Sequence, residues 1–188
     1  MRAAAVDAFV VSHLPNIRYL TGFAGSAGLV VLTPGQCVLV VDFRYQTVAR
    51  SLVQSRPDVA AAVTVVVPAR NYDETLAEVL RETGARRIGI EGAWMSVSRF
   101  NRLSSALAGL APTPLRSPDG CPALIATERI IEAGRVVKDE VEIATLKEAG
   151  RRLGEATAEA VGFVQPGRTE LEIAADVGFP LLVRPSYV

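Results

Sequence analysis

The sequence predicts an α/β fold in which a mixed β-sheet is flanked by helices. Short apolar runs rich in β-branched residues alternate with segments whose apolar residues recur every three or four positions, as in helices packed on a sheet. Two early apolar runs surround a Pro-Gly turn, which predicts an antiparallel hairpin. The later strand-helix-strand units favour parallel pairing through right-handed crossovers. The sheet should therefore contain both kinds of pairing.

The first predicted elements are the hairpin and a helix. Residues 28–32 and 37–41 form the two strands, with Pro34 and Gly35 in the turn between them. Because both runs are continuously apolar, we expect both faces of these strands to be buried. The next helix ends before Pro57. Its apolar face comprises Tyr45, Val48, Ala49 and Leu52.

Two further strand-helix units follow the hairpin. Residues 63–67 predict a buried strand that Pro68 stops, and Asp73 can cap a helix that ends at Gly84. Residues 87–91 return as a strand. The apolar stripe of the last helix in this region comprises Phe100, Leu103, Leu107 and Leu110.

A Pro- and Gly-rich run over residues 111–122 interrupts this alternation and predicts a domain boundary. We expect a first domain over residues 1–122, then a linker and helices over residues 123–177. Residues 178–188 have a different character and are expected to form an unrelated tail. The chain length and a hydrophobic content of 49% suit this arrangement of one domain plus part of another.

Two helices are predicted within residues 123–177. A long helix begins after Lys138 and is ended by Pro166 and Gly167. Thr169 and Glu172 have the spacing of a capping box, so the next helix should start at Glu170. The inner stripe of the long helix comprises Leu146, Ala149, Leu153, Ala156, Ala160 and Val164.

The composition argues against several classes of protein. Twenty basic and twenty acidic side chains cancel, and the basic ones are scattered, so we expect no nucleic-acid partner. No stretch approaches the roughly 18 apolar residues of a membrane span, and Asp7 comes too early for a secretory signal. Cys37 and Cys121 match no metal or redox spacing, which favours free thiols. A cytoplasmic protein without membrane contact is expected.

Three polar residues are candidates for a binding site. Asp42, Arg44 and Tyr45 lie where a predicted strand passes into a helix, a location where α/β proteins often place binding groups. Asp42 can equally cap the helix or form a structural ion pair, since helix N-termini attract acidic residues. Both interpretations remain open at this point.

Other residues that carry chemistry have simpler explanations. His13 is the only histidine, and a metal or catalytic role would require partners such as Asp42 or Glu91; a solvated or hydrogen-bonded side chain is the alternative. Glycines 22, 25 and 28 precede a hairpin strand and not a helix, which favours a structural turn over a nucleotide loop. Trp94 is expected to be a packing residue.

The sequence contains five informative blocks, at residues 16–23, 40–45, 88–92, 95–97 and 135–143. In this order they resemble the creatinase, prolidase and Xaa-Pro aminopeptidase family, and the resemblance covers about residues 5–177. It implies a creatinase-type amino-terminal domain with a ribonuclease-H-like mixed sheet, followed by the truncated helical start of the family's pita-bread domain.

The resemblance also implies a parent activity, which is metal-dependent hydrolysis of the bond preceding proline in a peptide. In this family two divalent metals, such as manganese, cobalt or zinc, are held by two aspartates, a histidine and two glutamates of the pita-bread domain. None of these ligands maps onto this sequence, so we expect no catalytic residue, no metal ligand and no cofactor in this chain. Whether the chain is itself an enzyme stays open at this point. We expect the chain to be inactive by itself.

By the same resemblance, Asp42, Arg44 and Tyr45 are candidates for a substrate pocket or a subunit interface, and a homo-oligomer is expected. The alternative function is a non-catalytic oligomerisation or interaction module that pairs with a full-length relative. A small-molecule binder using the Asp42 region is a third hypothesis.

Residues 178–188 resemble a segment of carbamoyl-phosphate synthase large subunits, and we interpret them as a junction or fusion relic without ATP binding.

Overall fold

The computed structural model describes residues 1, 4–68, 71–108 and 122–183. The chain divides into two compact units, Met1–Val136 and Val137–Val188. Each unit is described by itself.

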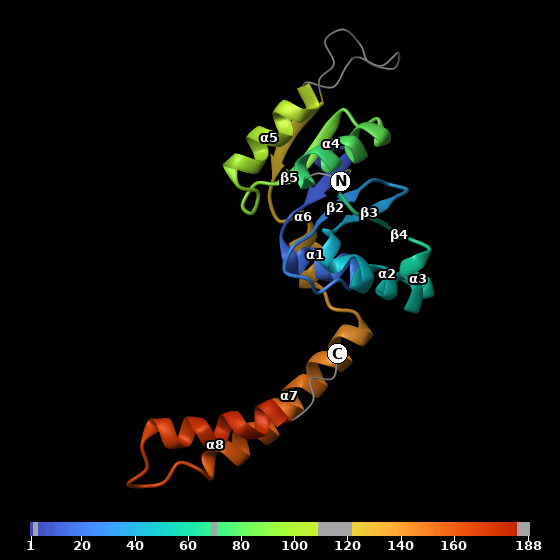
Figure 1. Cartoon of the computed structure of the whole chain (residues 1–188). Helices are drawn as coiled ribbons and strands as arrows, with labels where there is room; N and C mark the ends of the chain where they lie inside the picture. Colours follow the sequence, from blue (N-terminus) through green and yellow to red (C-terminus); the bar gives the residue numbers. More distant parts are fainter. Residues whose placement is uncertain (2–3, 69–70, 109–121, 184–188) are drawn as a thin grey trace. The chain divides into compact units, whose positions relative to one another are not determined.

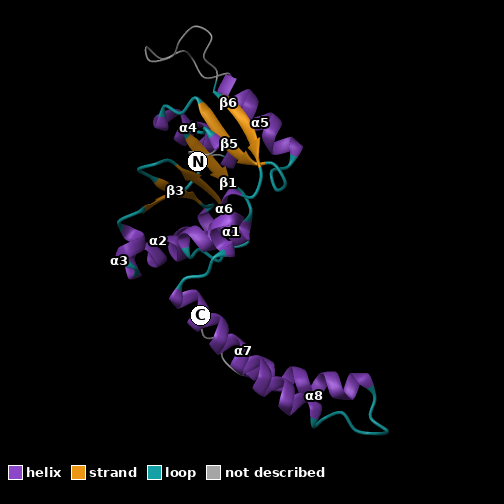
Figure 2. Ribbon diagram, turned by 180° about the vertical axis from the view of Figure 1, so that it is seen from behind, coloured by secondary structure: helices purple, strands orange, loops and turns teal. Residues whose placement is uncertain are grey.

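A mixed sheet of six strands forms the centre of the first unit, in the order β4-β3-β2-β1-β5-β6 (Figure 1, Figure 2). β2 pairs antiparallel with β1 and β3, whereas the pairs β3–β4, β1–β5 and β5–β6 are parallel. The predicted mixed sheet is therefore confirmed. The strands are β1 (Ala8–Val11), β2 (Leu29–Leu32), β3 (Cys37–Val40), β4 (Val63–Val66), β5 (Arg87–Glu91) and β6 (Ala123–Thr127).

Helices cover both faces of this sheet. On one face α4 (Tyr72–Thr83) and α5 (Val97–Ala108) bury apolar side chains against β1, β2, β3 and β5. On the other face lie α1 (Leu14–Thr21), η2 (Phe43–Tyr45), α2 (Gln46–Ser55), α3 (Pro57–Ala60) and α6 (Ile130–Val136). Because strand side chains alternate between faces, Ala8 and Val10 of β1 pack with α4 and α5, whereas Phe9 and Val11 pack with α1.

The predicted first domain, residues 1–122, is too short. β6 pairs with β5 along its whole length, and Ile130 and Ile131 of α6 pack on the core of the second face. Residues 123–136 therefore belong to the first unit and not to the linker that the sequence predicted. The Pro- and Gly-rich run that suggested the boundary lies largely outside the described residues.

The cap of α4 also differs from the prediction. The side chain of Asn71 accepts the backbone N–H of Glu74, so Asn71 is the N-cap, and Asp73 lies in the first turn. Gly84 ends the helix in the left-handed conformation at φ 68°, as predicted. Asp73 is free for a different contact, described below.

Gly89 occupies a position in β5 where no side chain fits. A Cβ atom there would lie 2.6 Å from Cδ2 of Phe9 and 3.2 Å from Cγ2 of Val6, and both neighbours are buried. We expect Gly89→Ala to lower the free energy of unfolding by about 1–3 kcal/mol, because the extra methyl group overpacks the core. Urea unfolding followed by Trp94 fluorescence measures the change.

Gly35→Ala is the matched control, since no heavy atom of the described residues beyond its two chain neighbours lies within 4 Å of its Cβ position. Equal urea midpoints for Gly89→Ala and the unchanged protein would contradict the close packing of Gly89 on Phe9.

The second unit contains α7 (Glu140–Val161) and α8 (Glu170–Val183). Asp139 and Glu142 form a capping box at the start of α7, and Thr169 with Glu172 forms the predicted reciprocal contacts before α8. α7 ends at Val161, earlier than predicted, and α8 continues through residue 178. The interpretation of residues 178–188 as an unrelated tail that resembles carbamoyl-phosphate synthases stays a prediction. Residues 184–188 lie outside the described part of the chain.

Apolar side chains of this second unit are largely exposed. They include Val141, Leu146, Leu153 and Leu171. Within the described residues, no helix is both long and apolar enough to cross a membrane.

Candidate functional site

The three candidate residues lie together at the carboxyl end of β3, in and just before η2. Asp42 caps η2, because its Oδ1 accepts the backbone N–H of Arg44 at 3.0 Å. The guanidinium of Arg44 folds back onto the same carboxylate, with Nη2 2.8 Å from Oδ2. The capping interpretation of Asp42 is therefore correct, and it does not exclude a further role for the exposed Arg44.

Tyr72 of α4 attaches this turn to the rest of the unit. The backbone N–H of Asp42 donates to the Tyr72 hydroxyl at 2.7 Å, and that hydroxyl lies 3.3 Å from Oδ2 of Asp42. The hydrogen bond from Arg44 is the main cause that lowers the pKa of Asp42. Burial raises the pKa of Tyr72. Asp42 is thus an anion at neutral pH, and its carboxylate already accepts from the backbone N–H, Nε and Nη2 of Arg44 and from the Tyr72 hydroxyl.

Tyr45 joins η2 to the glycine-rich loop. Its hydroxyl lies 2.6 Å from Oγ of Ser26, and the hydrogen bond from Ser26 is the main cause that lowers the pKa of Tyr45. Its ring contacts Phe23 edge to face, with centroids 5.5 Å apart. The glycines of this loop allow the chain to turn and to pass close to the Phe23 ring. Gly22 ends α1 at φ 76°, and a Cβ at Gly25 would overlap the Phe23 ring.

The outward side of η2 is available for contacts. Phe43 is 79% exposed and the Arg44 side chain is 60% exposed, so a cationic group and an apolar ring are presented together. Such a pair can bind a carboxylate or pack against another protein surface. Among the described residues, these side chains form no nucleophile-base pair.

A second polar cluster, which sequence reasoning did not find, surrounds Glu91 at the carboxyl end of β5. Glu91 is 5% exposed. Its Oε2 accepts the backbone N–H groups of Ser12 and His13 at 2.6 and 2.7 Å, and its Oε1 accepts Nδ2 of Asn16 at 2.7 Å. The carboxylate therefore holds the start of α1 against the end of β5.

Asn16 extends this cluster to α6. Its Nδ2 also donates to Oε1 of Glu132 at 2.7 Å, and its Oδ1 accepts Nη1 of Arg135 at 2.8 Å. Because Asn16 is fully buried, each polar atom of its amide requires such a partner. The only sequence signal for this role was a polar residue between Pro15 and Ile17, at the start of the block over residues 16–23.

His13 and Trp94 lie beside this cluster. Their rings stack with centroids 3.7 Å apart and planes 3° apart. Among the described residues Nδ1 of His13 finds no hydrogen-bond partner, and it lies 3.8 Å from Oε1 of Glu132. Of the two partners suggested by sequence, Glu91 contacts only the backbone of His13, and Asp42 belongs to the η2 turn. Trp94 packs on His13 but remains 55% exposed.

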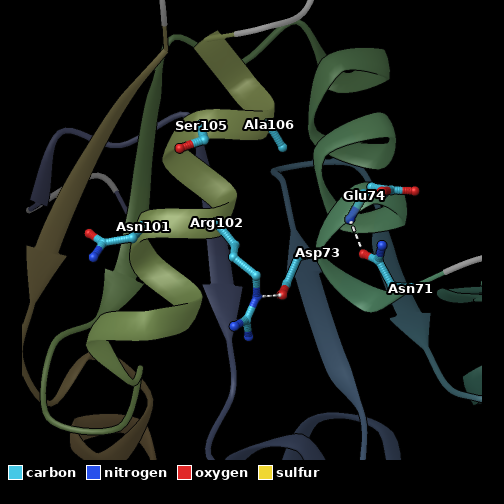
Figure 3. Close-up of a pocket in the computed structure, with 7 residues that line it drawn as sticks. All are labelled: Asn71, Asp73, Glu74, Asn101, Arg102, Ser105 and Ala106. Atoms are coloured by element: carbon cyan, nitrogen blue, oxygen red, sulfur yellow. Dashed lines mark hydrogen bonds and ion pairs between the residues drawn. The ribbon is translucent and has the colours of Figure 1, made fainter.

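A shallow groove of about 360 Å³ lies between α4 and α5. Figure 3 shows Arg102 of α5 reaching across to Asp73 of α4. Asp73 also accepts Nε of Arg99 at 3.0 Å, so its buried carboxylate is paired with two guanidinium groups. We interpret this contact as a link between the two helices and not as a reactive site.

A metal site would require several ligating side chains close together in the part of the chain that the structure describes. Within it, no group of three or more His, Cys, Asp or Glu side chains is placed to hold a metal ion.

Similarity to known proteins is extensive. The family model for the creatinase/prolidase N-terminal domain matches residues 1–137. The chain is 32% identical to the probable dipeptidase PepE of Mycobacterium tuberculosis, over 84% of this chain and 44% of that protein. It thus spans less than half the length of this curated relative.

Two solved structures have similar folds. An Xaa-Pro dipeptidase from Bacillus anthracis has a TM-score of 0.77 at 24% identity, over 95% of this chain and 44% of that one. The N-terminal domain of cytoplasmic peptidase PepQ from M. tuberculosis has a TM-score of 0.55 at 29% identity, over 70% of this chain and 89% of that one.

Proposed function

Since this chain belongs to the creatinase/prolidase N-terminal domain family, we propose that it is the amino-terminal part of a metal-dependent peptidase that hydrolyses the bond preceding proline. The match over residues 1–137 carries this proposal. It is supported by the relative PepE, which is more than twice as long as the region it shares with this chain. In this proposal the chain alone does not hydrolyse peptides, and the cytoplasm is its location.

The proposed task of the η2 turn is to complete a substrate pocket or a subunit contact. The exposure of Phe43 and of the Arg44 side chain supports it, because both are accessible to a partner, whereas Tyr45 packs against the core of the second face. Asp42 and Tyr45 would fix the position of Arg44, and Arg44 would make the contact with a proline-containing peptide or a second subunit.

Two divalent metals belong to the proposed parent activity. The residues described in this chain do not fit such ions, because they offer no group of three suitable side chains. We therefore assign no metal to this chain and derive no step of hydrolysis through one.

A non-catalytic module that pairs with a full-length relative is the second candidate. The exposed apolar side chains of η2 and α2, Phe43 and Val48, favour it, because such residues are enriched at protein contacts. Both candidate functions use the exposed side chains of η2. The module differs from the peptidase part because it requires no covalent link to a metal-binding domain.

A chimera separates the two candidates. Residues 1–136 of this chain would replace the matched segment of M. tuberculosis PepE, whose unaltered form is the positive control. We expect the chimera to hydrolyse an Xaa-Pro dipeptide with added manganese, and the 188-residue chain alone to show no turnover. Turnover by the chain alone would contradict the first proposal. So would an inactive chimera, combined with a separate chain that binds PepE and changes its kcat/KM on mixing.

A further inference from the structure

The carboxyl ends of β5 and β6, together with Phe9 of β1, line a pocket. We propose that this pocket binds a small organic cation, an ammonium or guanidinium group on a short apolar stem. This pocket is separate from η2, because β2 and β1 lie between β3 and β5 in the sheet. The proposal does not depend on the proposed peptidase function.

The topology of the sheet creates this pocket. After β5 the chain leaves toward the face that carries α5, whose Leu103 and Leu107 pack with Ile88 and Ile90. After β6 it leaves toward the opposite face, where Ile130 of α6 packs in the other core. Where adjacent parallel strands send their connections to opposite faces, a crevice opens at their carboxyl ends, and α/β proteins bind ligands there.

The crevice has the size of a small-molecule site. Its volume is about 360 Å³, near the lower end of the range of ligand pockets, roughly 300–1,000 Å³. Residues of the β5–α5 connection form one wall, and residues 127–130 and Glu132 form the other. A ligand of a few carbons with one charged group fits this volume.

An indole ring forms an apolar wall of the pocket. Trp94 lines the pocket, and its ring is held flat against His13 by the stacking contact. Phe9, Ala93 and Ile130 add apolar surface. An oriented indole face attracts cations through its quadrupole, most strongly when the cation is partly desolvated.

The charged lining selects the sign of the ligand. Three carboxylates, Glu91, Glu128 and Glu132, line the pocket with a single guanidinium, Arg129. Glu91 is committed to Ser12, His13 and Asn16. Burial is the largest single influence on Glu132 and opposes its ionisation. The hydrogen bond from Asn16, a backbone hydrogen bond and the nearby His13 and Arg135 together outweigh burial, so the pKa of Glu132 is lowered. Glu128 and Glu132 are the carboxylates that would pair with a cation, although Oε1 of Glu132 also accepts from Asn16.

The chain offers a direct readout, because Trp94 is its only tryptophan. The full chain would be titrated with agmatine and with n-butylamine at constant ionic strength, and Trp94 emission would be followed. We expect saturable changes with both cations and none with butyrate, which has a similar stem and the opposite charge. An arginine-containing tetrapeptide tests whether the cation can instead be part of a peptide.

Variants assign the signal to the pocket. Glu128→Gln and Glu132→Gln should each weaken binding by about tenfold or more, the loss expected for one charge-assisted hydrogen bond. Glu78→Gln, an exposed position on α4, should leave it unchanged. Because Glu132 also contacts Asn16, urea unfolding checks that the variants fold, and Glu128→Gln avoids that contact. Absence of saturation, an equal response to butyrate, or an equal effect of Glu78→Gln would overturn the proposal.

Discussion

Replacing Glu91 with alanine is expected to lower the free energy of unfolding by about 3–5 kcal/mol. The carboxylate is buried and accepts two backbone N–H groups and the amide of Asn16. Its removal leaves the backbone N–H groups of Ser12 and His13 without this acceptor, and Asn16 keeps only Glu132 as a carboxylate partner. Each buried unpaired group costs about 1–3 kcal/mol. Urea unfolding monitored by Trp94 fluorescence reports on this unit.

Glu91→Gln refines the same test. Its amide oxygen can still accept the N–H groups of Ser12 and His13, but its NH₂ would face the donor Nδ2 of Asn16. We expect Glu91→Gln to lower the free energy of unfolding by about 1–2 kcal/mol. Its stability would thus lie between that of Glu91→Ala and that of the unchanged protein. Glu78→Ala, exposed on α4, is the control. If Glu78→Ala lowers the free energy of unfolding as much as Glu91→Ala does, the hydrogen bonds of Glu91 do not stabilise this unit as proposed.

Phe23→Ala is expected to cost about 3–5 kcal/mol. The side chain is 1% exposed and packs in the core beneath α1 and α2, edge to face with Tyr45. Gly25 and Gly28 lie so close to its ring that the loop has little room to collapse into the cavity that alanine would leave. The glycine-rich loop is thus shaped around this ring.

Phe43→Ala is the matched control for Phe23, because the same side chain is 79% exposed there. We expect its free energy of unfolding to change by at most about 0.5 kcal/mol. Similar urea midpoints for the two variants would contradict the packing role of Phe23 and, with it, the structural explanation of the loop glycines.

Local patterns predicted much of this fold. The hairpin, the helices over residues 46–55 and 97–108, the end of α4 at Gly84 and the start of α8 at Glu170 are confirmed, since each depends on periodicity or on a cap within a few residues. β1 was missed because four buried residues give no periodicity that distinguishes a strand. β6 was missed because it follows a run rich in Pro and Gly.

The polar contacts of the sites were less accessible to sequence reasoning. The cap formed by Asp42 is local and was one of two interpretations offered. Its contact with Tyr72 spans 30 residues, and that of Asn16 with Glu91 spans 75. Asp73 was assigned to a cap because nothing nearby in sequence indicates Arg99 and Arg102 as its partners. Such pairings arise only when the sheet brings distant segments together.

The most direct measurement of the central claim is kcat/KM of the chimera with PepE, on an Xaa-Pro dipeptide and on the same dipeptide with alanine in place of proline. If this unit is the amino-terminal part of an Xaa-Pro peptidase, kcat/KM on the proline substrate should stay within about tenfold of that of unaltered PepE, or about 1.4 kcal/mol in transition-state stabilisation. The preference for proline should be retained. A chimera that unfolds cooperatively and binds manganese, yet hydrolyses neither dipeptide, would contradict the claim.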